Sequence, residues 1–211
     1  MRTVSYTDLK NRFTSAIGVD SLLTAEETAF KRSLNDRVRG AWTKAKWPEF
    51  LNVVSKAVAA VDTSTMKADK AVQIDNASDL FDVYSVWDKV PWEDRTAQRI
   101  EYTLMGGYLV LPAETSETTV YVVGSQVPAD DYGDGTTTLP AFLERFLLAA
   151  TVSDFYRSDG QVDKALSEEQ RAESYLLDEL DRNERLQQQN KVLVTPYPAY
   201  WPTLLVTQTT V

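Results

Sequence analysis

The chain contains neither cysteine nor histidine among its 211 residues. Without cysteine it has no disulfide framework, no thiolate nucleophile and no cysteine-ligated zinc or iron–sulfur centre. Without histidine it lacks the commonest general base near neutral pH and the commonest ligand of transition metals. Catalysis by Ser–His–Asp or Cys–His groups is therefore excluded, which leaves carboxylate, lysine or tyrosine chemistry, or no chemistry at all.

Long apolar runs are missing as well, since no stretch reaches the roughly 18 apolar residues that a membrane-spanning helix needs. The N-terminal residues MRTVSYTDLK contain no continuous apolar segment, so we expect no signal peptide and no membrane partner. Hydrophobic residues make up 43% of the chain, enough for a sizeable core. We expect one domain over residues 1–190 that works in the compartment where it is made.

Positive charge is in the minority, with 22 basic residues against 31 acidic ones and a net charge of −9. Such a chain repels phosphate backbones, so ordinary nucleic-acid binding is not expected. Lysine and arginine gather in residues 31–46, but they alternate there with apolar residues at helical spacing. This pattern predicts a solvated helix face.

The best-patterned stretch covers residues 138–190 and predicts two helices joined at Asp159-Gly160. The second helix is long and charged, with a narrow apolar stripe. In the first, apolar residues recur at intervals of three and four, which places them on one helix face: Leu139, Phe142, Leu143, Phe146, Leu147 and Ala150. We expect the first helix at the centre of a core, beside the long amphipathic second helix.

Helices are also expected in the N-terminal part. Residues 7–17 carry an apolar face and are followed by Gly18, a typical C-terminal cap. The sequence TAEE at residues 24–27 predicts a capping box at the start of a second helix, and Pro48 predicts a kink or restart. The spacing of the next apolar residues predicts a third helical segment; they are Phe50, Leu51, Val54 and Val58.

Residues from about 71 to 126 are instead rich in β-branched and aromatic side chains, bounded by turn-forming residues. Gly106-Gly107 supplies the positive φ angles that a two-residue hairpin turn demands. We expect a small antiparallel β-unit inserted at about 71–126 between two helical parts. The predicted fold class is α+β: mainly a helical bundle with this inserted β-unit and an extended C-terminal arm.

The arm comprises residues 191–211. Pro196, Pro198 and Pro202 prevent a helix there and favour an extended or polyproline conformation. Either the arm folds back over its own core, or it lies on a neighbouring subunit or partner; we predict the second. The candidate partner-interface residues are its large apolar side chains: Tyr197, Tyr200, Trp201, Leu204 and Leu205.

Three short motifs were weighed as sites of chemistry. Asp130, Asp131 and Asp134 lie close together, but the glutamate of a calcium loop is missing. The carboxylate pairs on the long helix have arginines within reach, which predicts solvated ion pairs. Gly106-Gly107 leads into a strand and not a helix, so it is no nucleotide-binding fingerprint. We expect no catalytic, cofactor-binding or metal-binding residues.

Several of these features occur together in a known arrangement. The apolar helix ends in Tyr156-Arg157-x-Asp159-Gly160-Gln161 and is followed by a long helix rich in glutamate and alanine. A VYVV run at residues 120–123 precedes this pair, and a Trp-Pro corner at Trp47-Pro48 lies further upstream. Residues 140–180 above all resemble the head–tail connector (adaptor) proteins of tailed bacteriophages. The arm from Lys191 departs from shorter members of that family.

The resemblance implies a structural virion protein without enzymatic activity. Its subunits would form a homo-oligomeric ring, commonly a dodecamer, beneath the portal protein. The ring would join the capsid to the tail, bind a downstream tail or stopper protein, and let DNA pass without specific binding. The protein would reside in the virion neck, and in the host cytoplasm during assembly. The alternatives are another neck or tail-completion protein such as a stopper, or a soluble enzyme with carboxylate chemistry.

Overall fold

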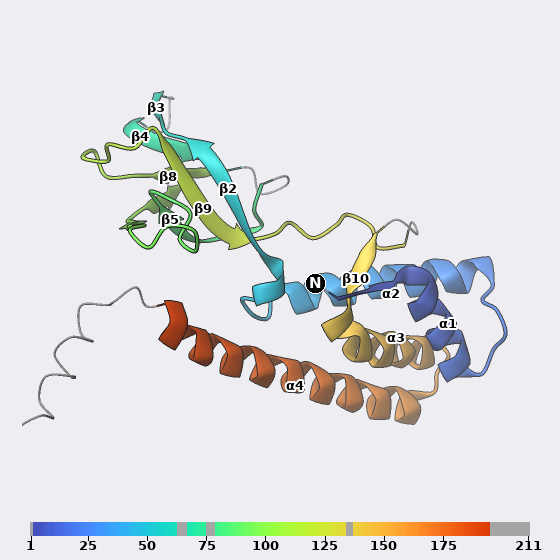
Figure 1. Cartoon of the computed structure of the whole chain (residues 1–211). Coiled ribbons are helices and arrows are strands. Elements are labelled where there is room, and N and C mark those ends of the chain that lie inside the picture. The colour runs from blue at the N-terminus through green and yellow to red at the C-terminus, as the bar shows by residue number, and fades with distance from the viewer. Residues whose placement is uncertain (1, 63–66, 75–78, 134–136, 195–211) are drawn as a thin grey trace, which may run out of the picture.

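The computed structural model describes residues 2–62, 67–74, 79–133 and 137–194, without the side chains of residues 187–194. Over these residues the fold is α+β, with four α-helices and ten strands. Figure 1 shows the helices gathered in one part of the molecule and most strands in another. The chain passes from the helical part to the β-unit after α2 and returns before α3.

The helical part is arranged around α3 (Glu144–Ser158), which packs against the three other helices. These are α1 (Tyr6–Ile17), α2 (Thr24–Trp42) and α4 (Val162–Val194). Leu147 on α3 is fully buried, and Phe146 is 7% exposed. Gly160, with φ of 77°, turns the chain from α3 into α4. The predicted helix pair with a central first member is confirmed from Glu144 onward. Residues 138–143, which were predicted to begin the first helix, instead form strand β10 (Thr138–Pro140) and the 3-10 turn Ala141–Leu143.

The helix ends follow local chemistry. Ser5 caps α1 by accepting a 3.0 Å hydrogen bond from the Asp8 N–H, and Gly18 ends it in the left-handed conformation, as predicted. At α2 the predicted capping box was wrong by one residue. Leu23 is the N-cap residue, and its side chain makes no capping hydrogen bond. Its backbone N–H donates to the Glu26 carboxylate at 2.8 Å, which satisfies that donor.

The β-unit contains two antiparallel four-stranded sheets. The first has the order β2 (Leu51–Ala57), β9 (Thr119–Ser125), β5 (Asp82–Trp87), β6 (Arg99–Ile100). The second has the order β3 (Ala59–Asp62), β4 (Lys67–Gln73), β8 (Tyr108–Val110), β7 (Thr103–Met105). They share a hydrophobic core of their own: Val72, Ile74, Leu80, Val86, Leu109, Leu111, Val120 and Val122.

Two expectations about this region were wrong. The predicted third helix is strand β2 after the short 3-10 turn Pro48–Phe50, and strands therefore begin at Leu51 rather than near residue 71. Because β2 pairs along its whole length with β9, from Leu51↔Ser125 to Ala57↔Thr119, tertiary pairing decided its conformation. With a second core of this size, the protein is not mainly a helical bundle.

Two further elements complete the fold. The predicted hairpin is confirmed, since Gly106 and Gly107 connect β7 to β8 with φ angles of 58° and 82°. A two-stranded sheet, absent from our expectations, pairs β1 (Thr3–Ser5) with β10 (Thr138–Pro140). Strand β10 leads through the 3-10 turn Ala141–Leu143 into α3, so the N-terminal residues brace the entry to the central helix.

The C-terminal prediction is only partly accessible. Helix α4 continues to Val194, beyond the predicted end at residue 190. The candidate interface residues Tyr197, Tyr200, Trp201, Leu204 and Leu205 lie outside the described residues. In the part of the chain that the structure does describe, no helix is both long and apolar enough to cross a membrane.

Candidate functional site

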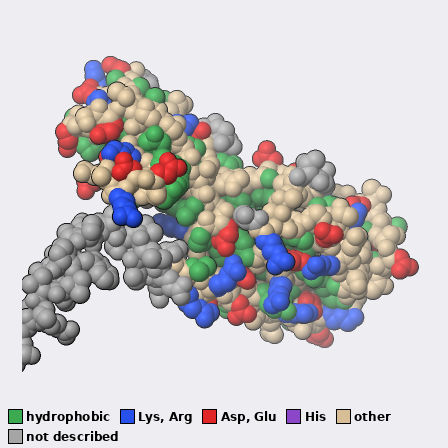
Figure 2. All heavy atoms as spheres, viewed as in Figure 1, with side chains coloured by type: hydrophobic (Ala, Val, Ile, Leu, Met, Phe, Trp, Pro, Cys, Tyr) green, Lys and Arg blue, Asp and Glu red, His purple; other side chains and the backbone are tan. Residues whose placement is uncertain are grey.

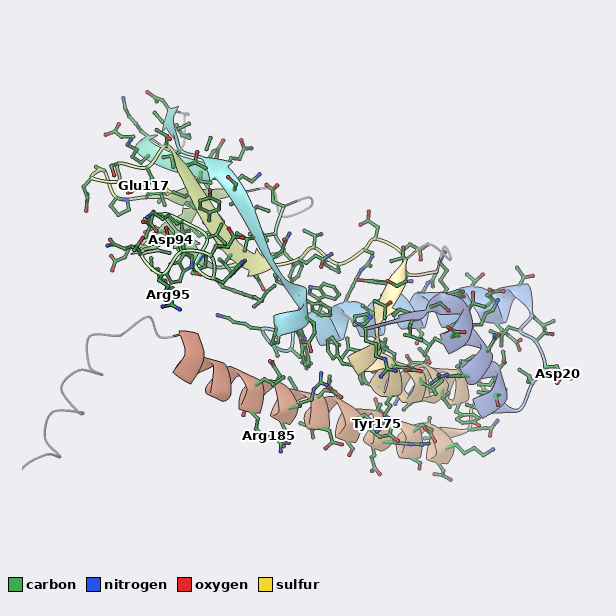
Figure 3. The ribbon with its side chains drawn as sticks, in the orientation of Figure 1. Asp20, Asp94, Arg95, Glu117, Tyr175 and Arg185 are labelled. Carbon is green, nitrogen blue, oxygen red and sulfur yellow. The ribbon has the colours of Figure 1, made fainter. Side chains whose placement is uncertain are left out.

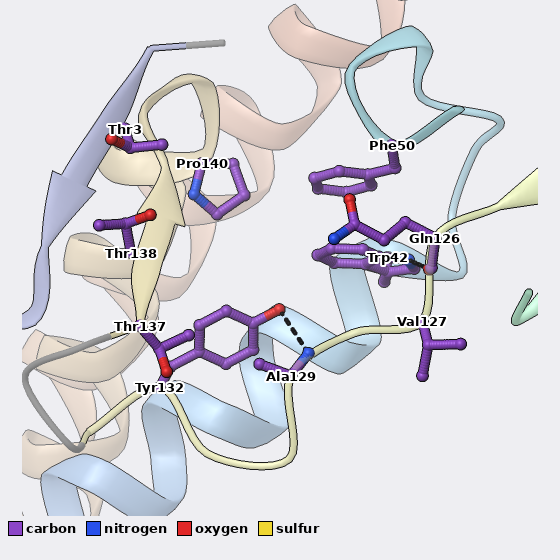
Figure 4. Close-up of a pocket in the computed structure, with 10 residues that line it drawn as sticks. All are labelled: Thr3, Trp42, Phe50, Gln126, Val127, Ala129, Tyr132, Thr137, Thr138 and Pro140. Carbon is purple, nitrogen blue, oxygen red and sulfur yellow. Dashed lines mark hydrogen bonds between the residues drawn. The ribbon is translucent and has the colours of Figure 1, made fainter. Parts of the chain in front are cut away.

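The two passages between the helical part and the β-unit meet at one aromatic junction, formed by Trp42 and Phe50 (Figure 4). The Trp42 indole N–H lies 3.1 Å from the Ser125 Oγ and 3.0 Å from the Gln126 carbonyl oxygen. The Gln126 N–H donates to the Phe50 carbonyl at 2.7 Å. The outgoing and returning segments are therefore bonded to each other and to the end of α2.

Trp47 closes this junction from the other side. Its indole N–H donates to the Ala41 carbonyl at 2.9 Å, and its ring centroid lies 5.0 Å from that of Phe142. Only 2% of the residue is exposed. Trp47 is thus a packing anchor at the corner.

A cavity of about 430 Å³ lies beside the junction. Its lining is Thr3, Trp42, Phe50, Gln126, Val127, Ala129, Tyr132, Thr137, Thr138 and Pro140 (Figure 4). Among the described residues of this lining, Tyr132 is the one titratable side chain. Burial raises its pKa, and the hydrogen bond from the Ala129 N–H and the charge of Arg39 only partly oppose this. The described lining therefore offers apolar surface and hydroxyl groups, with no acid or base active near neutral pH.

The aspartate-rich loop before β10 is held against α2. Asp131 forms an ion pair with Lys31 and accepts the Gly133 N–H at 2.8 Å. The hydrogen bond from Lys31 and the one from Gly133 lower the pKa of Asp131. Asn35 receives the Tyr132 N–H at 3.0 Å, while Asp134 lies outside the described residues.

A charged cluster ties α2 to α3. The Arg37 guanidinium binds both carboxylate oxygens of Asp154, and the Ser33 hydroxyl donates to Asp154 at 2.6 Å. Burial alone would raise the pKa of Asp154, but the hydrogen bonds from Arg37 and Ser33 outweigh it and the pKa is lowered. The basic residues of α2 are thus not simply the solvated face that the sequence predicted, because Lys31 and Arg37 join α2 to other segments.

A second, charged cavity of about 590 Å³ opens where α3 begins beside α4. It is lined by Arg2, Glu49, Ala141, Phe142, Glu144, Arg145, Glu179 and Arg182. Arg182 lies 3.2 Å from Glu49 and 2.9 Å from Glu179, the latter without hydrogen-bond alignment. Burial first, and then the charge of Glu49, raise the pKa of Glu179 although Arg182 lowers it. Three arginines face three glutamates, so the cavity carries no excess charge to attract an ion.

Glu168 and Glu169, one of the carboxylate pairs on the long helix, take part in ion pairs. Glu168 lies 3.4 Å from Arg171 on the same helix, and Glu169 pairs with Arg157 of α3. Among the residues that the structure describes, no group of three or more potential ligands is arranged to hold a metal ion.

Comparison with models of known protein families gives no match, and a search of curated proteins finds no relative. Function is therefore argued from the surfaces of the chain itself. On the face shown in Figure 2, acidic and basic side chains alternate with apolar ones over the helical part. No single sign of charge dominates that view.

Helix α4 is the longest helix of the described residues and carries exposed side chains at regular spacing. Its 33 residues span about 50 Å at 1.5 Å per residue, whereas α3 has 15 residues. Figure 3 shows Arg185 extending from α4 on the side away from the helical core. Val162, Leu166 and Leu177 are exposed on the same helix, although their side chains are apolar. Exposed apolar side chains in a row are typical of contact surfaces.

Proposed function

We propose that this protein is a structural component of a tailed-bacteriophage virion, a head-to-tail adaptor that forms a ring beneath the portal. The ring joins the capsid to the tail and lets DNA pass. The observation that carries this proposal is the α3–α4 pair, turned at Gly160, whose long second helix extends past α3 with an exposed apolar row. This is the part of the chain in which the resemblance to connector proteins is concentrated.

The junction supports a mechanical role. A subunit that transmits contacts between capsid and tail needs its parts held in fixed relative positions. The Trp42–Phe50 stack and the Gln126–Phe50 hydrogen bond hold both passages to the β-unit.

The charge balance supports the passage of DNA. A channel wall must not retain the duplex, and a chain with a net charge of −9 repels phosphates. Lys31 and Arg37, which belong to the most basic part of the sequence, are engaged with Asp131 and Asp154. Those two cations are therefore already neutralised within the subunit.

Residues 195–211 are proposed to contact the portal or the next tail component. Tyrosine and tryptophan contribute more binding energy per residue than most side chains at interfaces. Tyr197, Tyr200 and Trp201 provide three such side chains within five positions of the sequence.

The test is to mix the full chain with the purified portal ring of the same phage and to measure the mass of the complex by light scattering. We expect the portal to gain a ring of this protein, visible as an extra layer in low-resolution images. Binding only to a portal that already carries another neck protein would assign the stopper role instead. A monomer that ignores portal and tail and turns over a small substrate would overturn the proposal.

A truncated chain ending at Val194 tests the arm. We expect it to bind the portal or tail more weakly while keeping its far-UV helical signal. A matched substitution on the β-unit, Glu114→Gln, is expected to leave binding unchanged, because Glu114 is exposed and remote from the arm in sequence. Unfolding of the truncated chain would show that the arm belongs to the core.

A further inference from the structure

One exposed row of side chains on α4 has a composition of its own. Its members follow one another at intervals of three or four residues, so they share one side of the helix: Val162, Leu166, Gln170, Glu173, Leu177, Asp181 and Glu184, all exposed. We name this row the α4 stripe. Its apolar members Val162, Leu166 and Leu177 are 58%, 49% and 61% exposed.

The charged members of the α4 stripe all have the same sign. Glu173, Asp181 and Glu184 are carboxylates, so the stripe combines three apolar side chains with three negative charges. The basic residues of the helix up to position 186 fall on other sides of it; they are Lys164, Arg171, Arg182 and Arg185. A partner of this stripe must therefore offer apolar contact together with positive charge.

The outer side of α2 offers that combination. Its exposed row consists of four small residues and three charged ones, two of which are basic: Ala25, Thr28, Ala29, Arg32, Asp36, Arg39 and Gly40. We name this row the α2 stripe; it carries two arginines against one aspartate. A Cβ added to Gly40 would meet no atom within 4 Å, so packing inside the subunit gives no reason for a glycine there.

The two stripes match in length, and the sizes of their side chains are complementary. Positions 162 and 177 of α4, and positions 25 and 40 of α2, are both 15 residues apart, which is about 22 Å along a helix. The α4 stripe presents large apolar side chains, and the α2 stripe presents alanines and a glycine. Large side chains on one helix fit between small ones on another, which lets the two axes approach closely.

We infer that the α4 stripe of one subunit docks on the α2 stripe of a second copy of this chain. Helix α3 packs against both α2 and α4, and Figure 1 shows these two helices on different sides of it. A contact between two different surfaces leaves one stripe free at each end, so further copies can add until a ring closes. The inference deepens the proposed function, on which it rests, by naming the contact between neighbours in the ring.

Cross-linking tests the contact directly, because the chain has no cysteine of its own. Gln170→Cys lies near the middle of the α4 stripe and Ala29→Cys near the middle of the α2 stripe, and both positions are exposed. The double variant is treated with a bis-maleimide at about 1 mM protein, so that even a contact with a millimolar Kd is populated. It is expected to give a ladder of covalent oligomers. Each single variant is expected to stay monomeric on a denaturing gel.

Charge reversal tests the same contact without a cross-linker. Glu173→Arg and Arg32→Glu are each expected to weaken self-association about three- to tenfold, the effect of losing one exposed ion pair and adding repulsion. The two reversals in one chain restore opposite charges across the contact, so association is expected to recover. Glu114→Arg on the β-unit is the matched control and is expected to change nothing. Sedimentation velocity measures all four.

Failure of either the cross-linking test or the charge-reversal test overturns the inference. Dimers from Gln170→Cys alone would show that two α4 stripes meet each other. No cross-link in the double variant, or no recovery in the double reversal, would show that the stripes do not meet. A ladder without portal binding would keep this contact and reject the proposed function; portal binding without a ladder would do the reverse.

Discussion

Trp42 and Phe50 lie face to face, with their ring centroids 3.4 Å apart and their planes inclined by 6°. Trp42 ends α2, and Phe50 precedes the first strand of the β-unit. The same indole binds Ser125 and Gln126, where the chain returns. One tryptophan therefore fixes both passages between the two parts, so their connection is built like a core and not like a linker.

Trp42→Phe keeps an aromatic ring in the stack but removes the indole N–H. We expect the free energy of unfolding to fall by about 1–3 kcal/mol, because the buried Ser125 hydroxyl and the Gln126 carbonyl lose their donor. Urea denaturation followed by far-UV circular dichroism measures this. Trp92→Phe is the matched control: Trp92 is 63% exposed, so its loss is expected to stay within about 0.5 kcal/mol. Equal losses would contradict the role of the junction.

Phe146→Ala tests whether α3 is the centre of the helical part. Phe146 is buried in the helical core, so truncation is expected to lower the free energy of unfolding by about 3–5 kcal/mol. Truncation of an exposed apolar side chain to alanine, Leu104→Ala on β7, is expected to have little effect. Thermal or urea unfolding of the two variants gives the comparison. A loss under about 1 kcal/mol at Phe146 would mean that the helix is not central.

Local signals predicted the elements that depend on local chemistry. Gly18 ends α1, Gly160 turns α3 into α4, and Gly106-Gly107 forms the hairpin, because capping groups and positive φ angles act within a few residues. Strand β2 was missed for the opposite reason. Its apolar residues fit a helical spacing as well as a strand, and only pairing with β9, about 70 positions later in the sequence, settles the choice.

The junction shows the same limit. The Trp47-Pro48 corner was visible in the sequence as a predicted kink or restart of the helix. Gln126, whose carbonyl accepts the hydrogen bond from Trp42, lies 84 positions further along the chain, and no neighbouring residue marks it as a partner of Trp42. The division into two cores was invisible too, because valines and leucines in both have the same chemistry. Long-range contacts assign each of them to one side.

Acidification is expected to weaken the bond between α2 and α3. The folded-state pKa of Asp154 is below its ordinary value, so its contribution to stability is present above the unfolded pKa of about 3.9 and is lost as the pH falls through the folded pKa. Asp154→Asn is expected to cost about 1–3 kcal/mol near neutral pH, since Arg37 loses a charged acceptor. The variant's stability should then depend less on pH below about 4.

Urea midpoints between pH 2.5 and 7 check this dependence. Asp20→Asn is the matched control, because Asp20 is an exposed aspartate in the loop between α1 and α2. It is expected to leave the wild-type pH curve unchanged. Parallel pH curves for wild type and Asp154→Asn would contradict the prediction, because they would show that the titration of Asp154 does not change the free energy of unfolding.

Replacement of glycine by alanine is expected to have opposite effects on stability at Gly40 and at Gly124. Gly40 lies inside α2 with open space where a Cβ would be, so Gly40→Ala is expected to raise the free energy of unfolding by about 0.5–1 kcal/mol through helix propensity. Gly124 lies in β9 opposite the irregular part of β5, and its added Cβ would lie 2.0 Å from the Asp82 carbonyl oxygen. Because that atom belongs to the backbone, the strands must separate, and Gly124→Ala is expected to lower stability by about 1–3 kcal/mol.

Comparison of the two substitutions separates helix propensity from packing, because the chemical change is identical and only the surroundings differ. Chemical denaturation at low protein concentration measures both without interference from self-association. If Gly40→Ala destabilises the monomer, α2 is strained in a way that its open surroundings do not explain. If Gly124→Ala is neutral, β5 and β9 are not held as closely as their register requires. Stabilisation at position 40 with weaker self-association would add weight to the α2 stripe, because a glycine kept against its helix propensity is explained by a neighbour that approaches it.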